Sequence, residues 1–244
     1  MIELIDVVKA YARGRHVVNA LRGITIRISE GDFVSVQGPS GSGKTTLLNM
    51  IGLLDEPTFG SIRLFGRDTA PLSGRDQARL RSRSIGFVFQ SFNLIPSLNA
   101  WRNVALPLQY AGVRRGERRR RALTALASVN LQNRADHLPS ELSGGEEQRV
   151  AIARSLVIDP KLILADEPTG SLDTESGHVV MAQIRCLNDA AKTILVVTHD
   201  PIVLPYAKRE IRMRDGTVLP SLDDDPKQQQ QGSSRITPST TCDV

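Results

Sequence analysis

The stretch Gly38–Thr45, GPSGSGKT, has the residue spacing of a loop that binds a phosphate chain. Its glycines leave backbone N–H groups free to surround phosphate oxygens, its lysine reaches the β- and γ-phosphates, and its threonine can hold Mg²⁺. A strand-like run, FVSVQ, precedes the loop, and a helix-like run, TTLLNMIGLL, follows it. The alternative, a tight glycine turn with a surface lysine, does not require a strand before the loop and a helix after it, so the arrangement favours the phosphate loop. The predicted nucleotide ligands are Gly38, Pro39, Ser40, Gly41, Ser42, Gly43, Lys44, Thr45 and Thr46.

A second run, KLILADEP, ends in two adjacent carboxylates. Asp166 follows four apolar residues and is placed to hold magnesium. Glu167 is the candidate that polarises a water for attack on the γ-phosphate. An Asp-Glu pair after an apolar run can merely cap the next turn, but the phosphate loop favours the functional interpretation.

Two further apolar runs end in polar residues, Gln90 in IGFVFQ and His199 in TILVVTHD. Gln90 is a candidate to contact the metal or the attacking water, and His199 to contact the γ-phosphate. A lone histidine at a strand end is usually structural or exposed, so only the context favours this role. The predicted catalytic residues are Lys44, Gln90, Glu167 and His199, and the predicted metal ligands are Thr45, Gln90 and Asp166.

The segment LSGGEEQRV, Leu142–Val150, places two glycines at the start of a predicted helix. Glycine costs a helix about 1 kcal/mol relative to alanine, whereas an open helix start attracts anions. Ser143 and Glu146 also fit a capping box, which would make the segment only a helix start. The chain has one phosphate loop. Two copies meeting head to tail would let Ser143 and Gly145 of each reach the γ-phosphate held by the other.

The apolar runs predict an α/β fold. Runs that end in a polar residue are typical of parallel strands with functional carboxyl ends. IELIDVV and GITIRI alternate, which predicts antiparallel strands. Between Gln90 and Pro160 the strand signal gives way to helical stretches, so we expect a helical subdomain over about 91–159. Residues 221–244 are polar and of low complexity, which predicts a disordered tail.

Composition and apolar patterning argue against a membrane-spanning or secreted protein. The chain has 244 residues, of which 40% are hydrophobic and 23% charged, as in ordinary globular proteins. It contains no apolar run of the roughly 18–20 residues that span a membrane, and its start lacks a secretory signal. We therefore expect a cytoplasmic location, and any membrane role requires another polypeptide.

The net charge is +5. Six arginines lie within Gly112–Arg121, and Arg75, Arg79, Arg81 and Arg83 form a second cluster. Such clusters bind nucleic acid or anionic lipid, but more often they form a solvated helix face. No aromatic residues are interleaved to stack on bases. We therefore expect no nucleic-acid partner.

Together these motifs resemble the ATP-binding cassette (ABC) ATPases, from Met1 to about Pro220. GPSGSGKT is similar to the Walker A loop, LILADE to Walker B and LSGGEEQRVAIAR to the family signature, which includes Ser143, Gly144, Gly145 and Glu146. Gln90 matches the Q-loop, Asp173 ends the D-loop, His199 matches the switch histidine, and Tyr11 matches the residue that stacks on adenine. Glu146 replaces the more usual glutamine, and a carboxylate there would weaken the attraction of phosphate.

The resemblance implies a P-loop NTPase (RecA-like) core with an antiparallel β subdomain and an inserted α-helical subdomain, spanning residues 1–220. It implies ATP and Mg²⁺ as cofactors and a homodimer, or a paired ATPase, joined through two ATP molecules. It also implies an integral membrane permease as partner. The ATPase would lie at the cytoplasmic face of the inner membrane and would not contact the transported substrate.

Finer resemblance, carried by IGLLDEPTFGSI and GFVFQSFNLIPSLNAWRNVALPLQYAG, is to the branch of lipoprotein-releasing and macrolide-export ATPases. It favours a permease of the exporter or mechanical-work type. The alternatives are a cell-division-type ATPase without transport, a soluble ABC ATPase of DNA maintenance and a regulatory ATP-binding module. The apolar residues after Gln90 predict a groove for a cytoplasmic helix of the permease, with Leu94 and Leu98 in contact with it.

Overall fold

The computed structural model describes residues 1–14 and 16–220, so the predicted tail at 221–244 lies outside the described residues. The strands are β1 (Ile2–Arg13), β2 (His16–Ile28), β3 (Phe33–Gln37), β4 (Phe59–Leu64), β5 (Arg67–Asp68), β6 (Ile85–Phe89), β7 (Leu162–Asp166), β8 (Thr193–Thr198), β9 (Arg209–Arg214) and β10 (Thr217–Val218). The α-helices are α1 (Lys44–Ile51), α2 (Gly74–Ser84), α3 (Ala100–Tyr110), α4 (Arg115–Ala127), α5 (Gly144–Leu156) and α6 (Thr174–Asp189). Short 3-10 helices cover Gln132–Arg134, Pro139–Glu141 and Pro201–Val203.

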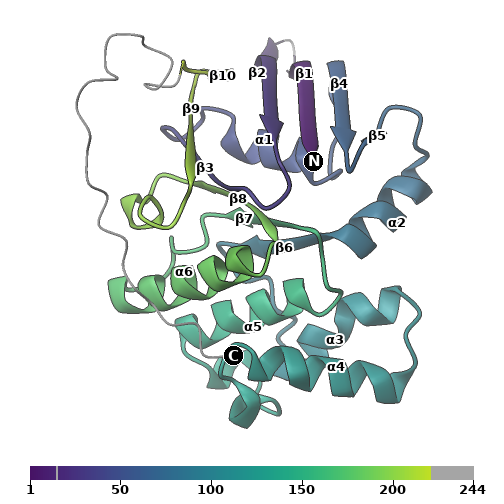
Figure 1. Cartoon of the computed structure of the whole chain (residues 1–244), viewed down its shortest axis with the longest axis vertical. Helices are drawn as coiled ribbons and strands as arrows, with labels where there is room; N and C mark the ends of the chain where they lie inside the picture. Colours follow the sequence, from purple (N-terminus) through teal and green to yellow (C-terminus); the bar gives the residue numbers. More distant parts are fainter. Residues whose placement is uncertain (15, 221–244) are drawn as a thin grey trace.

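A six-stranded sheet in the order β10-β9-β3-β8-β7-β6 forms the centre of the molecule (Figure 1). Its neighbours from β9 to β6 are parallel, and β10 pairs antiparallel with β9. All six residues of β8 are buried, as expected where a parallel sheet is covered on both faces. In register, Phe89 of β6 pairs with Asp166 of β7, and Asp166 pairs with Val197 of β8. The predicted functional residues at these strand ends therefore share one edge.

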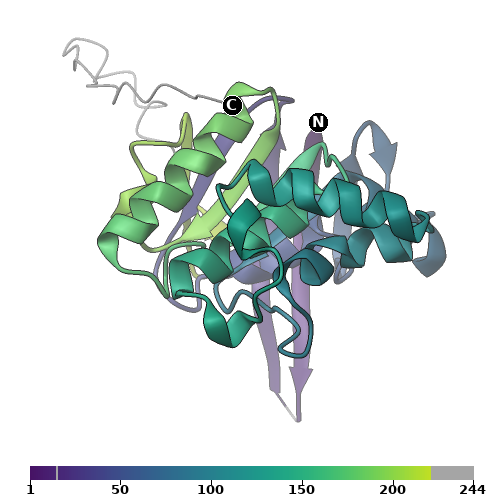
Figure 2. The same cartoon turned by 90° about the horizontal axis from the view of Figure 1, so that it is seen from below.

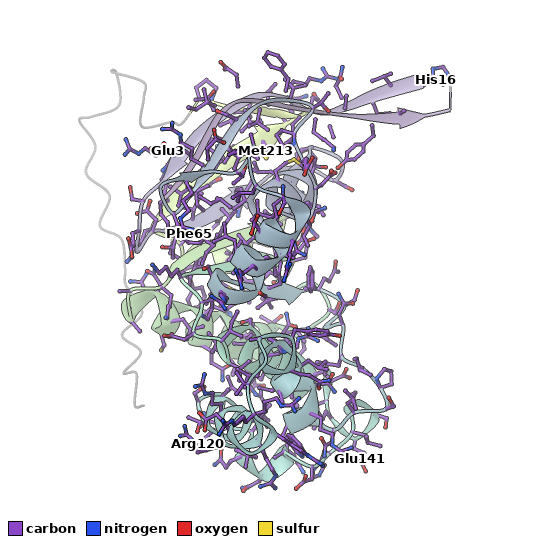
Figure 3. All side chains as sticks on the ribbon, turned by 90° about the vertical axis from the view of Figure 1, so that its right-hand side faces the viewer. Glu3, His16, Phe65, Arg120, Glu141 and Met213 are labelled. Carbon is purple, nitrogen blue, oxygen red and sulfur yellow. The ribbon has the colours of Figure 1, made fainter. Side chains whose placement is uncertain are left out.

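On one face of this sheet, α1 packs beneath an antiparallel sheet in the order β2-β1-β4-β5 (Figure 1). Leu47 and Ile51 of α1 join one apolar core with Ile24 of β2, and with Val34 and Val197 of the parallel sheet. The predicted P-loop NTPase fold with an antiparallel β subdomain is thereby confirmed. The first two strands are longer than predicted. Their hairpin projects from the body of the molecule (Figure 2), with His16 at its tip (Figure 3).

The other face of the parallel sheet is covered by α3, α4, α5 and α6 (Figure 1). Ile163 and Val196 point into this second core, where they join Val104 of α3, Leu126 of α4 and Ile152 of α5. The helices α3, α4 and α5 fill the chain between β6 and β7, where the strand signal disappears. The limits of a subdomain at about 91–159 stay a prediction.

Two side chains, the buried Asn103 and the half-buried Arg154, hold the turn that links β6 to α3. The Asn103 side chain donates to the carbonyls of Ile95 at 3.1 Å and Leu98 at 2.8 Å and accepts from the Ile95 N–H at 2.7 Å. From α5, Arg154 donates to the carbonyls of Phe92 at 2.7 Å and Asn93 at 2.5 Å. The turn after Gln90 is thus fixed from two helices.

We expect Asn103→Ala to lower the free energy of unfolding by about 1–3 kcal/mol, because it removes a fully buried side chain and its hydrogen bonds to partly buried backbone groups of the turn. Urea denaturation followed by circular dichroism measures the change. Gln109→Ala, on the exposed part of the same helix, is the matched control and should change stability by less than about 0.5 kcal/mol. Equal losses for the two variants would contradict this role of Asn103.

Candidate functional site

The phosphate loop joins β3 to α1, and two of its glycines meet neighbouring backbone. Gly43 caps α1 with φ 99° and ψ 5°, a left-handed conformation that favours glycine. A Cβ atom at Gly43 would lie 2.5 Å from the Ala20 carbonyl oxygen, and one at Gly38 would collide with the Met213 carbonyl oxygen. The loop passes between β2 and β9 only because these positions have no side chain.

Lys44 lies inside the loop, not on the surface. Its Nζ donates to the carbonyl oxygens of Gly38 at 2.8 Å and Pro39 at 3.1 Å, and the residue is only 8% exposed. The ammonium group and the amino end of α1 both bring positive charge to this loop, which suits an anion. Among the described residues, the buried Ser42 Oγ has no hydrogen-bond partner. The other predicted ligands divide by exposure: Pro39, Ser40, Gly41 and Thr45 are exposed, and Thr46 is half-buried.

Thr45 and Asp166 come together at the edge of the sheet, with Thr45 Oγ1 at 3.4 Å from Asp166 Oδ1. Burial raises the pKa of Asp166, and the negative charge of Glu167 raises that pKa further. Among residues 1–14 and 16–220 there is no cluster of three or more His, Cys, Asp or Glu side chains suited to a metal. The oxygen donors and the low carboxylate count fit Mg²⁺, which uses one or two carboxylates together with substrate phosphates and water.

Glu167 has a strained backbone conformation, and both of its carboxylate oxygens have partners. Its φ of 47° lies in the left-handed region. Thr198 Oγ1 donates to its Oε2 at 2.8 Å, and His199 Nδ1 lies 2.7 Å from its Oε1. The buried Thr198 was missed from the sequence, although it directly precedes His199 in the same strand-end run. These contacts fix the carboxylate at the edge beside Asp166.

Gln90 reaches the same edge from β6. A Cβ atom at Gly170 would lie 2.8 Å from Gln90 Nε2, so the amide packs directly on that glycine. The Gly170 N–H in turn donates to the Glu167 carbonyl oxygen at 3.0 Å. The structure thus gathers Gln90, Asp166, Glu167 and His199 along the carboxyl ends of β6, β7 and β8.

Tyr11 extends from β1 with its ring partly exposed and its hydroxyl anchored. The hydroxyl donates to Asp55 Oδ2 at 2.8 Å, and Lys9 Nζ donates to Asp55 Oδ1 at 2.6 Å. Burial, followed by Asp55, raises the pKa of Tyr11, while the Thr46 side chain acts in the opposite direction. Asp55 follows α1 and was missed from the sequence, where nothing connects it with Tyr11.

The predicted second glycine site forms the amino end of α5. Ser143 caps the helix, with its Oγ accepting from the Glu146 N–H at 3.3 Å while Glu146 Oε2 accepts from the Ser143 N–H at 2.8 Å. Gly144 is exposed. A Cβ atom at Gly145 would lie 3.0 Å from Ser176 Oγ of α6. Asp173 caps α6 by accepting from the Ser176 N–H at 2.9 Å.

The start of α5 lies far from the chain's own phosphate loop. The helices α1 and α5 belong to the cores on opposite faces of the parallel sheet. Figure 3 shows the same separation: Met213, which contacts Gly38, and Glu141, which shortly precedes Ser143, lie in different halves of the molecule. The structure therefore does not bring Ser143 and Gly145 to the phosphate loop of the same chain.

A groove of about 880 Å³ runs between α2, β6 and the end of α3. Its lining includes the apolar side chains of Phe87, Phe89, Leu106, Pro107 and Tyr110 and the guanidinium groups of Arg75, Arg79 and Arg83. Leu94 and Leu98, the expected contacts, do not line it, and Leu94 instead packs against the core. This groove lies at the other end of α3, and docking of a permease helix at Leu94 and Leu98 stays a prediction.

Across the part of the chain that the structure describes, no helix is long and apolar enough to cross a membrane.

Comparison with known proteins identifies the family. The family model described as "ABC transporter" matches residues 21–170. The chain is 49% identical to an uncharacterised ABC transporter ATP-binding protein, YknY of Bacillus subtilis, over 91% of this chain and 96% of that protein. It is also 46% identical to the macrolide export ATP-binding/permease protein MacB of Chlorobaculum tepidum, over 94% of this chain but only 34% of that protein.

A solved structure supports the same conclusion. The ATP-binding cassette MJ0796, in a dimeric post-hydrolysis state bound to ADP and Pi, superposes with a TM-score of 0.83 at 45% identity. The match covers 89% of this chain and 96% of the cassette. MJ0796, from Methanocaldococcus jannaschii, carries the name of an uncharacterised ABC transporter ATP-binding protein.

We expect Asp166→Asn to raise the melting temperature by about 1–3 °C near neutral pH, because it removes a carboxylate destabilised by burial and by Glu167. A raised pKa in the folded state means that this cost is present above that pKa and disappears as pH falls through it. Thermal unfolding at about pH 8 and about pH 4 should show the difference from wild type shrinking at the lower pH, because the pH then approaches the ordinary pKa of an aspartate. A variant less stable than wild type at both values would contradict this account.

Proposed function

The chain belongs to the ABC transporter family of ATPases, and we propose that two copies close head to tail around two ATP molecules to drive a separate membrane permease of the exporter or mechanical-work type. The transporter relatives favour this function over a cell-division ATPase, a DNA-maintenance ATPase or a regulatory module. The ATPase would act at the cytoplasmic face of the inner membrane, without contact with the transported substrate.

One observation carries the head-to-tail arrangement: each chain places its phosphate loop and its α5 start in different halves of the molecule. Pairing two chains in opposite directions brings each half against the complementary half of the partner. The γ-phosphate bound by one chain then meets Ser143 Oγ and the Gly145 N–H of the other, with Gly144 leaving the approach open and Glu146 and Asp173 in the same interface. The dimeric state of the MJ0796 cassette supports this arrangement.

In each chain, the residues around the bound ATP have distinct functions. The loop Gly38–Thr46 surrounds the phosphates, Lys44 neutralises their charge, and the Tyr11 ring stacks on adenine. Thr45, Asp166 and Gln90 hold Mg²⁺, which neutralises charge on the phosphate oxygens when bound. The donor set described above fits this ion.

Glu167 carries the proton transfer in hydrolysis. Its carboxylate accepts a proton from the water whose oxygen attacks the γ-phosphorus, while the bond to the oxygen of the departing ADP breaks. Thr198 and His199 keep the carboxylate in place, and His199, 70% exposed, is accessible to the γ-phosphate. The left-handed backbone of Glu167 stores strain that these contacts overcome.

The groove beside β6 is the docking surface for the permease. Its apolar lining and arginine rim suit a short amphipathic helix that carries acidic residues. The groove is also lined by Phe89, which directly precedes Gln90, so nucleotide contacts and permease contacts meet on adjacent residues. MacB of Chlorobaculum tepidum is named as an ATP-binding/permease protein, which supports a membrane permease as the partner.

Two substitutions separate nucleotide binding from hydrolysis. Lys44→Ala should abolish ATP binding, because it removes the charge that meets the phosphates. Glu167→Gln should bind ATP, reduce turnover by at least about 100-fold and accumulate as a dimer. Analytical ultracentrifugation with and without ATP measures the dimer, and a Glu167→Gln protein that stays monomeric with ATP would contradict the proposed function.

Docking is tested by Tyr110→Glu, on a side chain that is 83% exposed and therefore not needed for folding. With the permease reconstituted in liposomes, we expect permease-stimulated turnover to fall at least about fivefold, because a carboxylate enters an apolar contact. Basal ATP turnover should not change. Leu219→Glu, an exposed apolar residue that does not line the groove, is the control. Normal stimulation of the Tyr110→Glu protein would place the permease elsewhere.

A further inference from the structure

A negative side chain stands where the proposed dimer needs to attract phosphate. Glu146 lies in the first turn of α5, one residue after Gly145, and Glu147 follows it. The amino end of a helix favours a carboxylate for the same reason that it favours phosphate. Glu146 therefore occupies part of the positive potential that the partner's γ-phosphate would use, and its charge repels that phosphate.

The geometry points to Arg134 as a positioning residue that neutralises Glu146 and so lets the start of α5 receive the partner's γ-phosphate. This inference rests on the proposed function. It assigns Arg134 no direct contact with the nucleotide. Its role is to set the charge and the orientation of a neighbouring side chain.

The two oxygens of Glu146 have different partners. Oε2 accepts from the Ser143 N–H at 2.8 Å and completes the helix cap, while Oε1 accepts from Arg134 Nε at 3.0 Å. The Glu146 side chain is only 16% exposed. Together these bonds turn the carboxylate away from free solvent. The hydrogen bond from the Ser143 backbone lowers the pKa of Glu146 most, burial raises it, and the bond from Arg134 lowers it again. The pKa of Glu146 therefore lies below its usual range.

Arg134 comes from a separate element, the 3-10 helix Gln132–Arg134. Its side chain is 48% exposed, and half-exposed ion pairs contribute little to folding. The pair therefore contributes little to the stability of the fold. Its larger contribution is to the charge at the start of α5. The pair has no net charge, whereas Glu146 alone would carry a full negative charge beside Ser143 and Gly145.

The test uses ATP as the probe and dimerisation of Glu167→Gln protein as the readout. Adding Arg134→Gln should raise the dissociation constant of the ATP-bound dimer by roughly threefold per site, hence about tenfold for two sites. The change is modest because solvent screens the charge of Glu146. ATP binding by the monomer should not change. Further adding Glu146→Gln should restore dimerisation, because glutamine keeps the cap without the charge. The deficit should also shrink as salt rises from about 0.05 M to about 0.5 M.

A control removes one of two exposed arginines that share a glutamate on α4. Arg120 Nη2 and Arg121 Nε both lie 2.7 Å from Glu117 Oε1, away from the proposed interface, so Arg121→Gln should leave dimerisation unchanged.

Three results would overturn the inference. Unchanged dimerisation of the Arg134→Gln protein would show that the charge of Glu146 does not matter. Failure of Glu146→Gln to rescue it, or a deficit independent of salt, would show a structural function of Arg134. A Glu167→Gln parent that stays monomeric with ATP contradicts the proposed function itself, which distinguishes that failure from the other outcomes.

Discussion

Backbone pairing between β6, β7 and β8 is the constraint on which the rest of the site depends. Because Phe89 pairs with Asp166 and Asp166 with Val197, the residues that follow these strands emerge side by side. A shift of one residue in β7 would turn Asp166 to the other face of the sheet and remove it from Thr45. The apolar side chains on both faces of β7 and β8 prevent that shift, since each would lose its place in one of the two cores. The geometry of the candidate site is thus fixed by ordinary core packing.

The sequence predicted the central strands well. The expected runs at 33–37, 85–90, 161–166 and 193–200 correspond closely to β3, β6, β7 and β8. Apolar runs bounded by glycine or polar residues are strong signals, and the phosphate loop fixes where the first run ends. Other elements carried weaker signals. Helix α2 has no buried residue and therefore no apolar period, and β9 alternates charged and apolar residues near the edge of the sheet.

The residues of the candidate site also fall into two groups, those that the sequence reveals and those that only the structure reveals. Motif residues are recognisable because their types and spacing serve chemistry within a short stretch. Thr198, Asp55 and Arg134 are recognisable only in three dimensions, since each acts on a residue from a different part of the chain. The separation of Ser143 from the phosphate loop, predicted only indirectly from the presence of a single loop, follows from the placement of α1 and α5 on opposite faces of the sheet.

The turn after Gln90 has a mechanical consequence. Arg154 clamps its first part to α5, and Asn103 clamps its second part to α3, so the turn has little slack. We therefore expect a displacement of Gln90 to move α3 as a whole instead of being absorbed within the turn. The far end of α3, at Leu106 and Tyr110, forms one wall of the arginine-rimmed groove. Side chains from α3 and α5 thus connect the predicted nucleotide contact at Gln90 to the groove that we propose as the docking surface, through one rigid helix.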